Sequence, residues 1–112
     1  MSDCLFCKIA AGTIPATVVK RSERMVAFRD INPQAPTHLL VIPTQHVASL
    51  DAATDPRVVG DLLLFARDLA REQGLATAGY RVVVNTNADG GQTVFHLHAH
   101  LLGGRAMRWP PG

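Results

Sequence analysis

The feature of this chain that most constrains its fold is a row of histidines that alternate with apolar residues. Residues 96–100 read HLHAH, and branched or aromatic residues flank them on both sides, which favours a β-strand over a helix. A strand points alternate side chains to opposite faces, so we expect the three imidazoles on one face. The residues expected in a core on the other face are Phe95, Leu97, Ala99 and Leu101.

The three imidazoles indicate chemistry at one surface, because the unperturbed pKa of histidine lies near neutrality. At about 3.3 Å per residue, His96 and His100 would stand about 13 Å apart along the strand, too far to bind one metal ion together. The alternative interpretations of the row are a structural role, or a metal site made by one His-x-His pair.

Length and charge limit the class of protein. The chain has 112 residues, 47% of them hydrophobic, which is enough for one domain with a real core. Its net charge of +2 argues against the basic surface of a nucleic-acid binder. No apolar run is long enough to span a bilayer, and the first residues lack the basic and apolar regions of a signal peptide. We therefore expect a cytoplasmic protein whose partners include neither nucleic acid nor a membrane.

The two cysteines, Cys4 and Cys7, are three positions apart. In a reducing compartment this spacing is typical of a metal site or a redox pair. A redox pair is expected between a strand and a helix, and no predicted strand precedes these cysteines, so metal binding is favoured. Zinc prefers four thiolate or imidazole ligands, so the remaining ligands would come from distant parts of the chain. Two free thiols on a short helix are the alternative.

The pattern along the chain predicts an α+β fold, with a mostly antiparallel five-stranded sheet, one short N-terminal helix and one long helix. Asp3 is expected to cap the first helix, which Gly12 ends. The long helix should begin at Asp55-Pro56 and end at Gly74, with an apolar stripe that faces the core. The predicted strands are residues 17–20, 25–29, 37–42, 80–84 and the histidine row.

A polar loop with glycines, residues 85–93, leads into the histidine row. Gly90 and Gly91 let the backbone approach a ligand closely, and N–H groups in a turn can bind an anion. The loop opens a strand rather than a helix, so it is not a P-loop. Its position would bring a phosphate to the histidines, where one imidazole could attack phosphorus while its neighbours handle protons and charge.

Four segments resemble the histidine-triad (HIT) family, and more closely its nucleotide-binding (Hint) branch. Residues 96–102 (HLHAHLL) match the signature His-φ-His-φ-His-φ-φ, in which φ is apolar. The other segments are residues 30–38 (DINPQAPTH), 89–95 (DGGQTVF) and 102–112 (LGGRAMRWPPG). The resemblance begins at about residue 4 and implies a HIT-like fold with a single domain over residues 1–112, in which 103–112 form an extended C-terminal tail.

The resemblance implies binding of purine nucleotides and hydrolysis of nucleoside 5′-phosphoramidates, in which AMP is joined to an amine. His98 matches the histidine that attacks the α-phosphorus to give a nucleotidyl-histidine, which water then cleaves. His38, His96 and His100 match positions that orient this nucleophile and assist proton transfer. Asp30 matches the carboxylate that holds the ribose hydroxyls.

The resemblance also implies which residues surround the nucleotide. The residues that match the phosphate side are Asn85, Gly91, Gln92 and Thr93. The residues that match the apolar slot for the base are Phe6, Phe28 and Ile31 in the first place, with Leu5, Ile9 and Leu40. Thr93 stands where serine is common, and its added methyl group could crowd the leaving group. His100 is glutamine in the nucleotidyl-transferase branches, so hydrolysis is favoured over transfer to a second substrate.

Cys4 and Cys7 resemble a zinc-binding pair that many bacterial relatives have and animal Hint proteins lack. The resemblance gives His46 and His96 as the other two ligands, and a metal-bound His96 could not carry protons. Two other functions stay open. One is a metallohydrolase, in which His96 and His98 hold zinc and water attacks directly. The other is a dimeric interaction module that binds nucleotide without catalysis.

The C-terminal tail predicts a homodimer. Trp109 is followed by two prolines, which lack the N–H groups that a strand needs, and its large apolar surface has to be buried somewhere. A sheet with an open edge commonly pairs in two-fold symmetry, which would bring each tail toward its partner. The resemblance implies that Trp109 shapes the leaving-group side of the neighbouring subunit's site. A solvated tail is the alternative.

Overall fold

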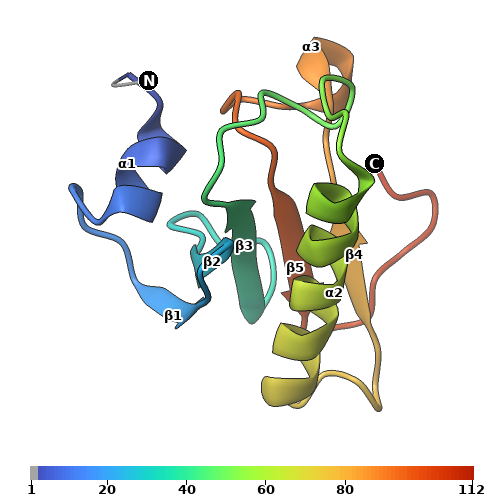
Figure 1. The fold of residues 1–112 in the computed structure, drawn as a ribbon. Helices are drawn as coiled ribbons and strands as arrows, with labels where there is room; N and C mark the ends of the chain where they lie inside the picture. Colours follow the sequence, from blue (N-terminus) through green and yellow to red (C-terminus); the bar gives the residue numbers. More distant parts are fainter. Residues whose placement is uncertain (1–2) are drawn as a thin grey trace.

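A five-stranded sheet with the order β1-β2-β3-β5-β4 forms the centre of the computed structural model, which describes residues 3–112 (Figure 1). Neighbouring strands are antiparallel throughout. The strands are β1 (Val18–Arg21), β2 (Met25–Arg29), β3 (Thr37–Pro43), β4 (Tyr80–Val83) and β5 (Ala99–Gly103). The sheet and its helices confirm the predicted α+β fold.

The two main helices pack on opposite faces of this sheet. Helix α2 (Pro56–Glu72) covers one apolar cluster, and α1 (Leu5–Ala11) covers a second, smaller one. Successive residues of β3 alternate between the clusters: Leu39 lies in the cluster under α2 and Leu40 in the cluster under α1. His100 pairs with Leu40 across β3 and β5, so its side chain lies on the face that α1 covers.

The ends of the helices follow their sequence signals with one exception. Asp55 caps α2, since its carboxylate accepts a hydrogen bond from the Arg57 N–H at 2.9 Å. The expectation that Asp3 caps α1 is wrong. Cys4 is the N-cap, and its Sγ accepts from the Cys7 N–H at 3.3 Å. The sulfur takes the place of the usual oxygen, so the helix begins with a potential metal ligand.

The histidine row is only partly a strand. β5 begins at Ala99, because the segment before it bonds to the loop after β3, where the Leu97 N–H donates to the Val47 carbonyl at 2.6 Å. Leu97, Ala99 and Leu101 are buried as expected. Phe95 is not: it is 52% exposed, since the chain has not yet entered the sheet at this point.

The loop predicted for residues 85–92 contains one helical turn, α3 (Asn87–Gly90), which the sequence analysis missed. Gln92 holds this turn against the rest of the domain. Its Oε1 accepts from the Asn87 N–H at 2.9 Å, and its Nε2 donates to the Ala48 and Val94 carbonyls at 2.8 and 3.1 Å. Over the described residues, no helix combines the length and the apolar character that crossing a bilayer requires.

Candidate functional site: a cavity beside a thiol–imidazole cluster

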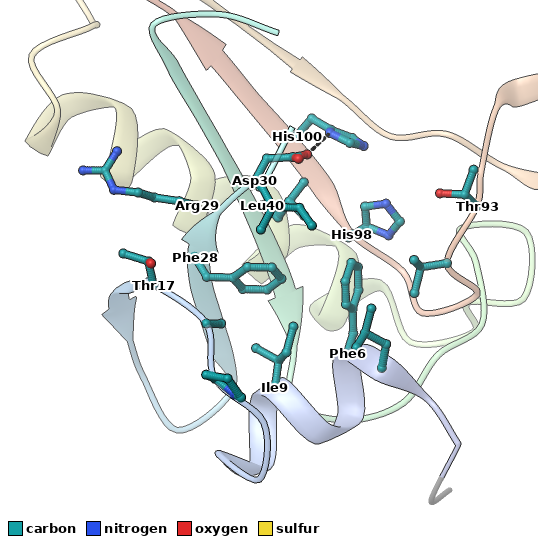
Figure 2. A pocket seen from close by; sticks show the side chains of 15 residues that line it. Phe6, Ile9, Thr17, Phe28, Arg29, Asp30, Leu40, Thr93, His98 and His100 are labelled. Carbon is teal, nitrogen blue, oxygen red and sulfur yellow. Dashed lines mark ion pairs between the residues drawn. The ribbon is translucent and has the colours of Figure 1, made fainter. Parts of the chain in front are cut away.

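A cavity of about 770 Å³ opens between α1 and the sheet (Figure 2). Its size lies within the range of about 300–1,000 Å³ that is usual for small-molecule sites. Ten of the residues expected around a nucleotide line it: Leu5, Phe6, Ile9, Phe28, Asp30, Ile31, Leu40, Thr93, His98 and His100. Residues distant in the sequence therefore meet at one cavity.

Other site residues expected from the sequence lie outside the lining. His38 and His96 lie behind it and contact His100 and the two cysteines instead. The remaining expected residues that do not line it are Asn85, Gly91, Gln92 and Trp109. Five lining residues were not expected from the sequence: Pro15, Ala16, Thr17, Arg29 and Val94. The sequence indicates these five residues only through their position, because each lies beside or between segments that were expected at the site.

The apolar part of the cavity centres on Phe6. Its ring meets the ring of Phe28 edge-on at 5.4 Å between centroids, and that of His98 at 5.1 Å. Such edge contacts between rings are favourable and fix the orientation of the side chains. Ile31 lies fully exposed at the rim, so only a bound molecule or another chain could cover it.

His98 presents a free lone pair. Its Nδ1 lies 2.7 Å from the His96 carbonyl oxygen, which can only accept, so Nδ1 carries the proton. In the neutral ring Nε2 is then the unprotonated nitrogen. Burial is the main cause that lowers the pKa of His98 below its usual value, which keeps the ring neutral at pH 7. A neutral imidazole with an open nitrogen on a cavity wall can act as a nucleophile.

His100 presents the opposite group, an N–H. The Gln34 N–H donates to Nδ1 of His38 at 3.0 Å, so neutral His38 carries its proton on Nε2. That nitrogen lies 2.9 Å from Nδ1 of His100 and 3.3 Å from an oxygen of Asp30. Nδ1 of His100 therefore accepts, and its proton is on Nε2. The cavity wall thus holds an unprotonated ring nitrogen at His98 and a hydrogen-bond donor at His100.

The pKa of His100 agrees with this arrangement. Burial, followed by the neighbouring His98 and His38, lowers the pKa of His100 to about 4, and the Asp30 carboxylate offsets this only in part. A second proton on His100 would have to lie on Nδ1, where it would meet the N–H of His38. Asp30, His38 and His100 could place ligand atoms around one metal ion. The proton on His38 Nε2, however, points at the place where such an ion would bind. This group holds protons rather than a metal.

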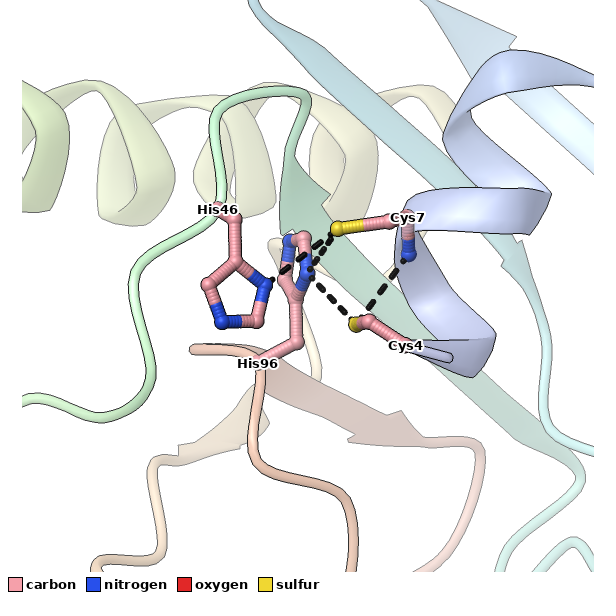
Figure 3. A group of neighbouring side chains, drawn as sticks. All are labelled: Cys4, Cys7, His46 and His96. Atoms are coloured by element: carbon pink, nitrogen blue, oxygen red, sulfur yellow. Dashed lines mark hydrogen bonds between the residues drawn. The ribbon is translucent and has the colours of Figure 1, made fainter. Parts of the chain in front are cut away.

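A second cluster lies beside the cavity and consists of Cys4, Cys7, His46 and His96 (Figure 3). The cysteines come from the start of α1, His46 from the loop after β3, and His96 from the segment before β5. Their four ligand atoms all lie within 4.8 Å of one another. We call these four residues the metal cluster.

The donor atoms of the metal cluster fit zinc. The sulfur–nitrogen distances are 3.3 Å from Cys4 to His96, 3.2 Å from Cys7 to His46 and 3.5 Å from Cys7 to His96. Tetrahedral zinc with its usual bond lengths gives about 3.5 Å for such an edge. Nε2 of His96 donates to the Pro43 carbonyl at 2.8 Å, which leaves the lone pair of Nδ1 facing the sulfurs. Burial and the adjacent Cys4 raise the pKa of the Cys7 thiol, so two thiolates here need a cation.

Comparison with known proteins agrees with this geometry. The HIT domain, defined as a sequence family, matches residues 11–107. The chain belongs to the HIT family. The HIT fold extends over nearly the whole chain, because a HIT family hydrolase from Legionella pneumophila Philadelphia 1 is 54% identical and superimposes with a TM-score of 0.95, covering 98% of this chain and 100% of that one.

Two further relatives differ in what their names record. A 14 kDa zinc-binding protein of Zea mays is 49% identical to this HIT protein, with 99% of this chain and 89% of the maize protein covered. A histidine triad nucleotide-binding protein of Candida albicans is 31% identical with a TM-score of 0.83, covering 96% of this chain and 83% of that one. Membership of the HIT family therefore explains why this protein has this fold and its row of histidines.

The buried state of His100 predicts a loss of stability in acid. Its folded pKa of about 4 lies below the unfolded value of 6.5, so between these pH values the unfolded chain binds more protons and acid favours unfolding. Urea denaturation should show that lowering the pH from 7.5 to 5 reduces the unfolding free energy of the parent by about 1–2 kcal/mol more than that of His100→Gln. Both proteins contain the metal cluster, so its own pH dependence cancels. Parallel pH curves for the two proteins would contradict the assignment.

Proposed function

We propose that this HIT protein binds purine nucleotides and hydrolyses nucleoside 5′-phosphoramidates through a nucleotidyl intermediate on His98. The observation that supports this most is the pair of complementary groups on one wall: an unprotonated nitrogen on His98 and an N–H on His100. The apolar side chains around Phe6 and Phe28 offer a slot for a purine ring, which stacking and burial can hold. Asp30 lies at the same cavity, where its carboxylate can accept from ribose hydroxyls.

The reaction follows from these positions. Nε2 of His98 attacks the α-phosphorus while the bond from phosphorus to the amine breaks, and the departing nitrogen takes up a proton from solvent. The N–H of His100 donates to the phosphoryl group as charge moves onto it. Water then attacks the adduct, the bond from His98 to phosphorus breaks, and the attacking water loses one proton to solvent, which replaces the proton that the amine took up. The products are a nucleoside monophosphate and a free amine.

Direct attack by a zinc-bound water fits the geometry less well. Such a site needs His96 and His98 to share one ion, but the ring of His96 faces the cysteines, and Nδ1 of His98 donates to the His96 carbonyl. The metal cluster also lies outside the cavity lining. A nucleophilic histidine is therefore the better account of how the bond is cleaved.

His98→Ala should abolish hydrolysis while nucleotide binding survives. The nucleophile makes the new bond but contributes only one contact to the bound nucleotide. We expect kcat for AMP joined to an amine to fall by about a thousandfold or more, and the AMP affinity measured by calorimetry to change less than about tenfold. His98→Asn, which keeps a polar side chain of similar length, should behave in the same way. Turnover within about tenfold of the parent would rule out the covalent route.

We propose that the metal cluster binds one zinc ion with a structural role, in line with its donor atoms and with the maize relative named for zinc binding. A bound ion would tie α1 to the loop after β3 and to the segment before β5. Two thiols at metal-ligand spacing also suit a reducing compartment, so we place the protein in the cytoplasm.

Metal analysis tests the zinc proposal. Protein purified without chelator should contain about one zinc per chain, and Cys4→Ser with Cys7→Ser should contain almost none, because zinc is held by thiolates. Protein that contains no zinc while both thiols react freely with a thiol reagent would contradict the proposal.

We propose that the protein is a homodimer in which Trp109 reaches the partner's cavity. Trp109 is 82% exposed in the single chain, although its tail is held on β4 by Arg81, whose Nη2 donates to the Arg108 carbonyl at 2.9 Å. A fixed tail that presents a large exposed ring is better suited to contact another chain than water. β4 is an edge strand, so a second copy could approach along it.

Deletion of residues 108–112 tests the position of Trp109. The truncated protein should change its ratio of rates between small and bulky amine leaving groups by several fold, with little change in AMP affinity, because the tail would meet the leaving group rather than the nucleotide. Light scattering of the parent should give twice the mass of one chain. An unchanged rate ratio, or a monomeric parent, would show that the tail has no role in the neighbouring site.

A further inference from the structure

Helix α1 takes part in two sites at once. Cys4 and Cys7, at its beginning, supply half of the metal cluster. Leu5, Phe6 and Ile9, from the same stretch of chain, line the cavity. We propose that metal binding at this cluster closes the nucleotide cavity by holding α1 in place as its wall, so that metal and nucleotide bind cooperatively. This inference rests on the proposed nucleotide function and adds its regulation.

The attachment of α1 to the sheet is small without a metal ion. The helix has seven residues, which is too short to be stable alone. Phe6 and Ile9 are its buried residues, and they pack into the small cluster of which Phe28 and Leu40 are part. Beyond this cluster, Nη1 of Arg21 donates to the Ala10 carbonyl at 2.9 Å. A metal ion bound to both cysteines would replace the weak contacts of Cys4 with His96 and of Cys7 with His46 by coordination bonds, and would therefore hold this wall more firmly.

The two sites also touch directly through Phe6. Its ring lies 6.1 Å from that of His96, which belongs to the metal cluster, and 5.1 Å from that of His98, which lines the cavity. The backbone adds a second link, because the His96 carbonyl accepts a hydrogen bond from Nδ1 of His98, with 2.7 Å between the two atoms. A shift of α1 or of His96 would therefore move the wall of the cavity and the histidine beside it.

Cooperativity of this kind is reciprocal. If a bound metal raises the affinity for nucleotide by some factor, nucleotide raises the affinity for the metal by the same factor. Couplings between two sites usually amount to about 5- to 150-fold. Because α1 forms a wall of the cavity and the metal cluster adds to what holds this helix, we expect a factor of at least about fivefold in both directions.

The experiment uses the full chain and AMP as the probe. Calorimetry should show AMP binding at least about fivefold more weakly to chelator-stripped protein than to zinc-loaded protein. His46→Ala, which removes a ligand outside both α1 and the cavity lining, should weaken AMP binding to the same extent. Gln45→Ala, the exposed neighbour of His46, is the matched control and should bind AMP like the parent. Competition with a zinc chelator should show the reciprocal gain in zinc affinity when AMP is present.

Hydrogen exchange of the chelator-stripped protein distinguishes local release of α1 from unfolding of the whole chain. We expect the amides of residues 5–11 to lose protection while those of α2 and β3 keep it. Equal AMP affinity of zinc-loaded and stripped protein would overturn the coupling and leave the proposed function standing. A zinc-loaded protein that does not bind AMP would instead overturn the proposed function. Failure to bind zinc, or unfolding of the whole chain when zinc is removed, would also overturn the inference.

Discussion

Three backbone groups determine where the protons of the buried imidazoles lie. The chemistry that the metal cluster and the cavity histidines can perform depends on these three groups. The Pro43 and His96 carbonyls can only accept, and the Gln34 amide can only donate. They place the lone pair of His96 toward the sulfurs, that of His98 on the cavity wall, and the proton of His38 toward His100. The backbone partner therefore determines whether the same side chain offers a lone pair toward the sulfurs, a lone pair toward the cavity or an N–H group.

The position of each histidine relative to the sheet explains how one row reaches both the metal cluster and the cavity. His96 precedes β5 and reaches the end of α1, whereas His100 lies within β5 opposite Leu40. The sheet face under α2 is filled with apolar side chains, so the polar groups are gathered on the face that α1 covers. α1 leaves part of this face open, and the cavity lies there. The site is thus a consequence of a sheet with one long and one short helix.

The sequence allowed much of this to be predicted where the signal is local. The apolar run of β2, the Asp55-Pro56 start of α2 and the Cys4–Cys7 spacing each identify an element or a candidate ligand pair. Signals that depend on distant contacts were missed. Phe95 is exposed because the chain before β5 bonds to Val47 instead of entering the sheet. The bond from Gln34 to His38, which fixes the protons of two imidazoles, has no sequence pattern of its own because its donor is a backbone amide.

The most direct test of this account is nitrogen-15 NMR of the histidine rings in zinc-loaded protein at pH 7. The chemical shifts of the two ring nitrogens show which one carries the proton and whether the ring is charged. The account predicts neutral rings with the proton on Nδ1 for His98 and on Nε2 for His38 and His100. A proton on Nε2 of His98, or a charged His98 ring, would remove the free lone pair and contradict the assignment of His98 as the nucleophile.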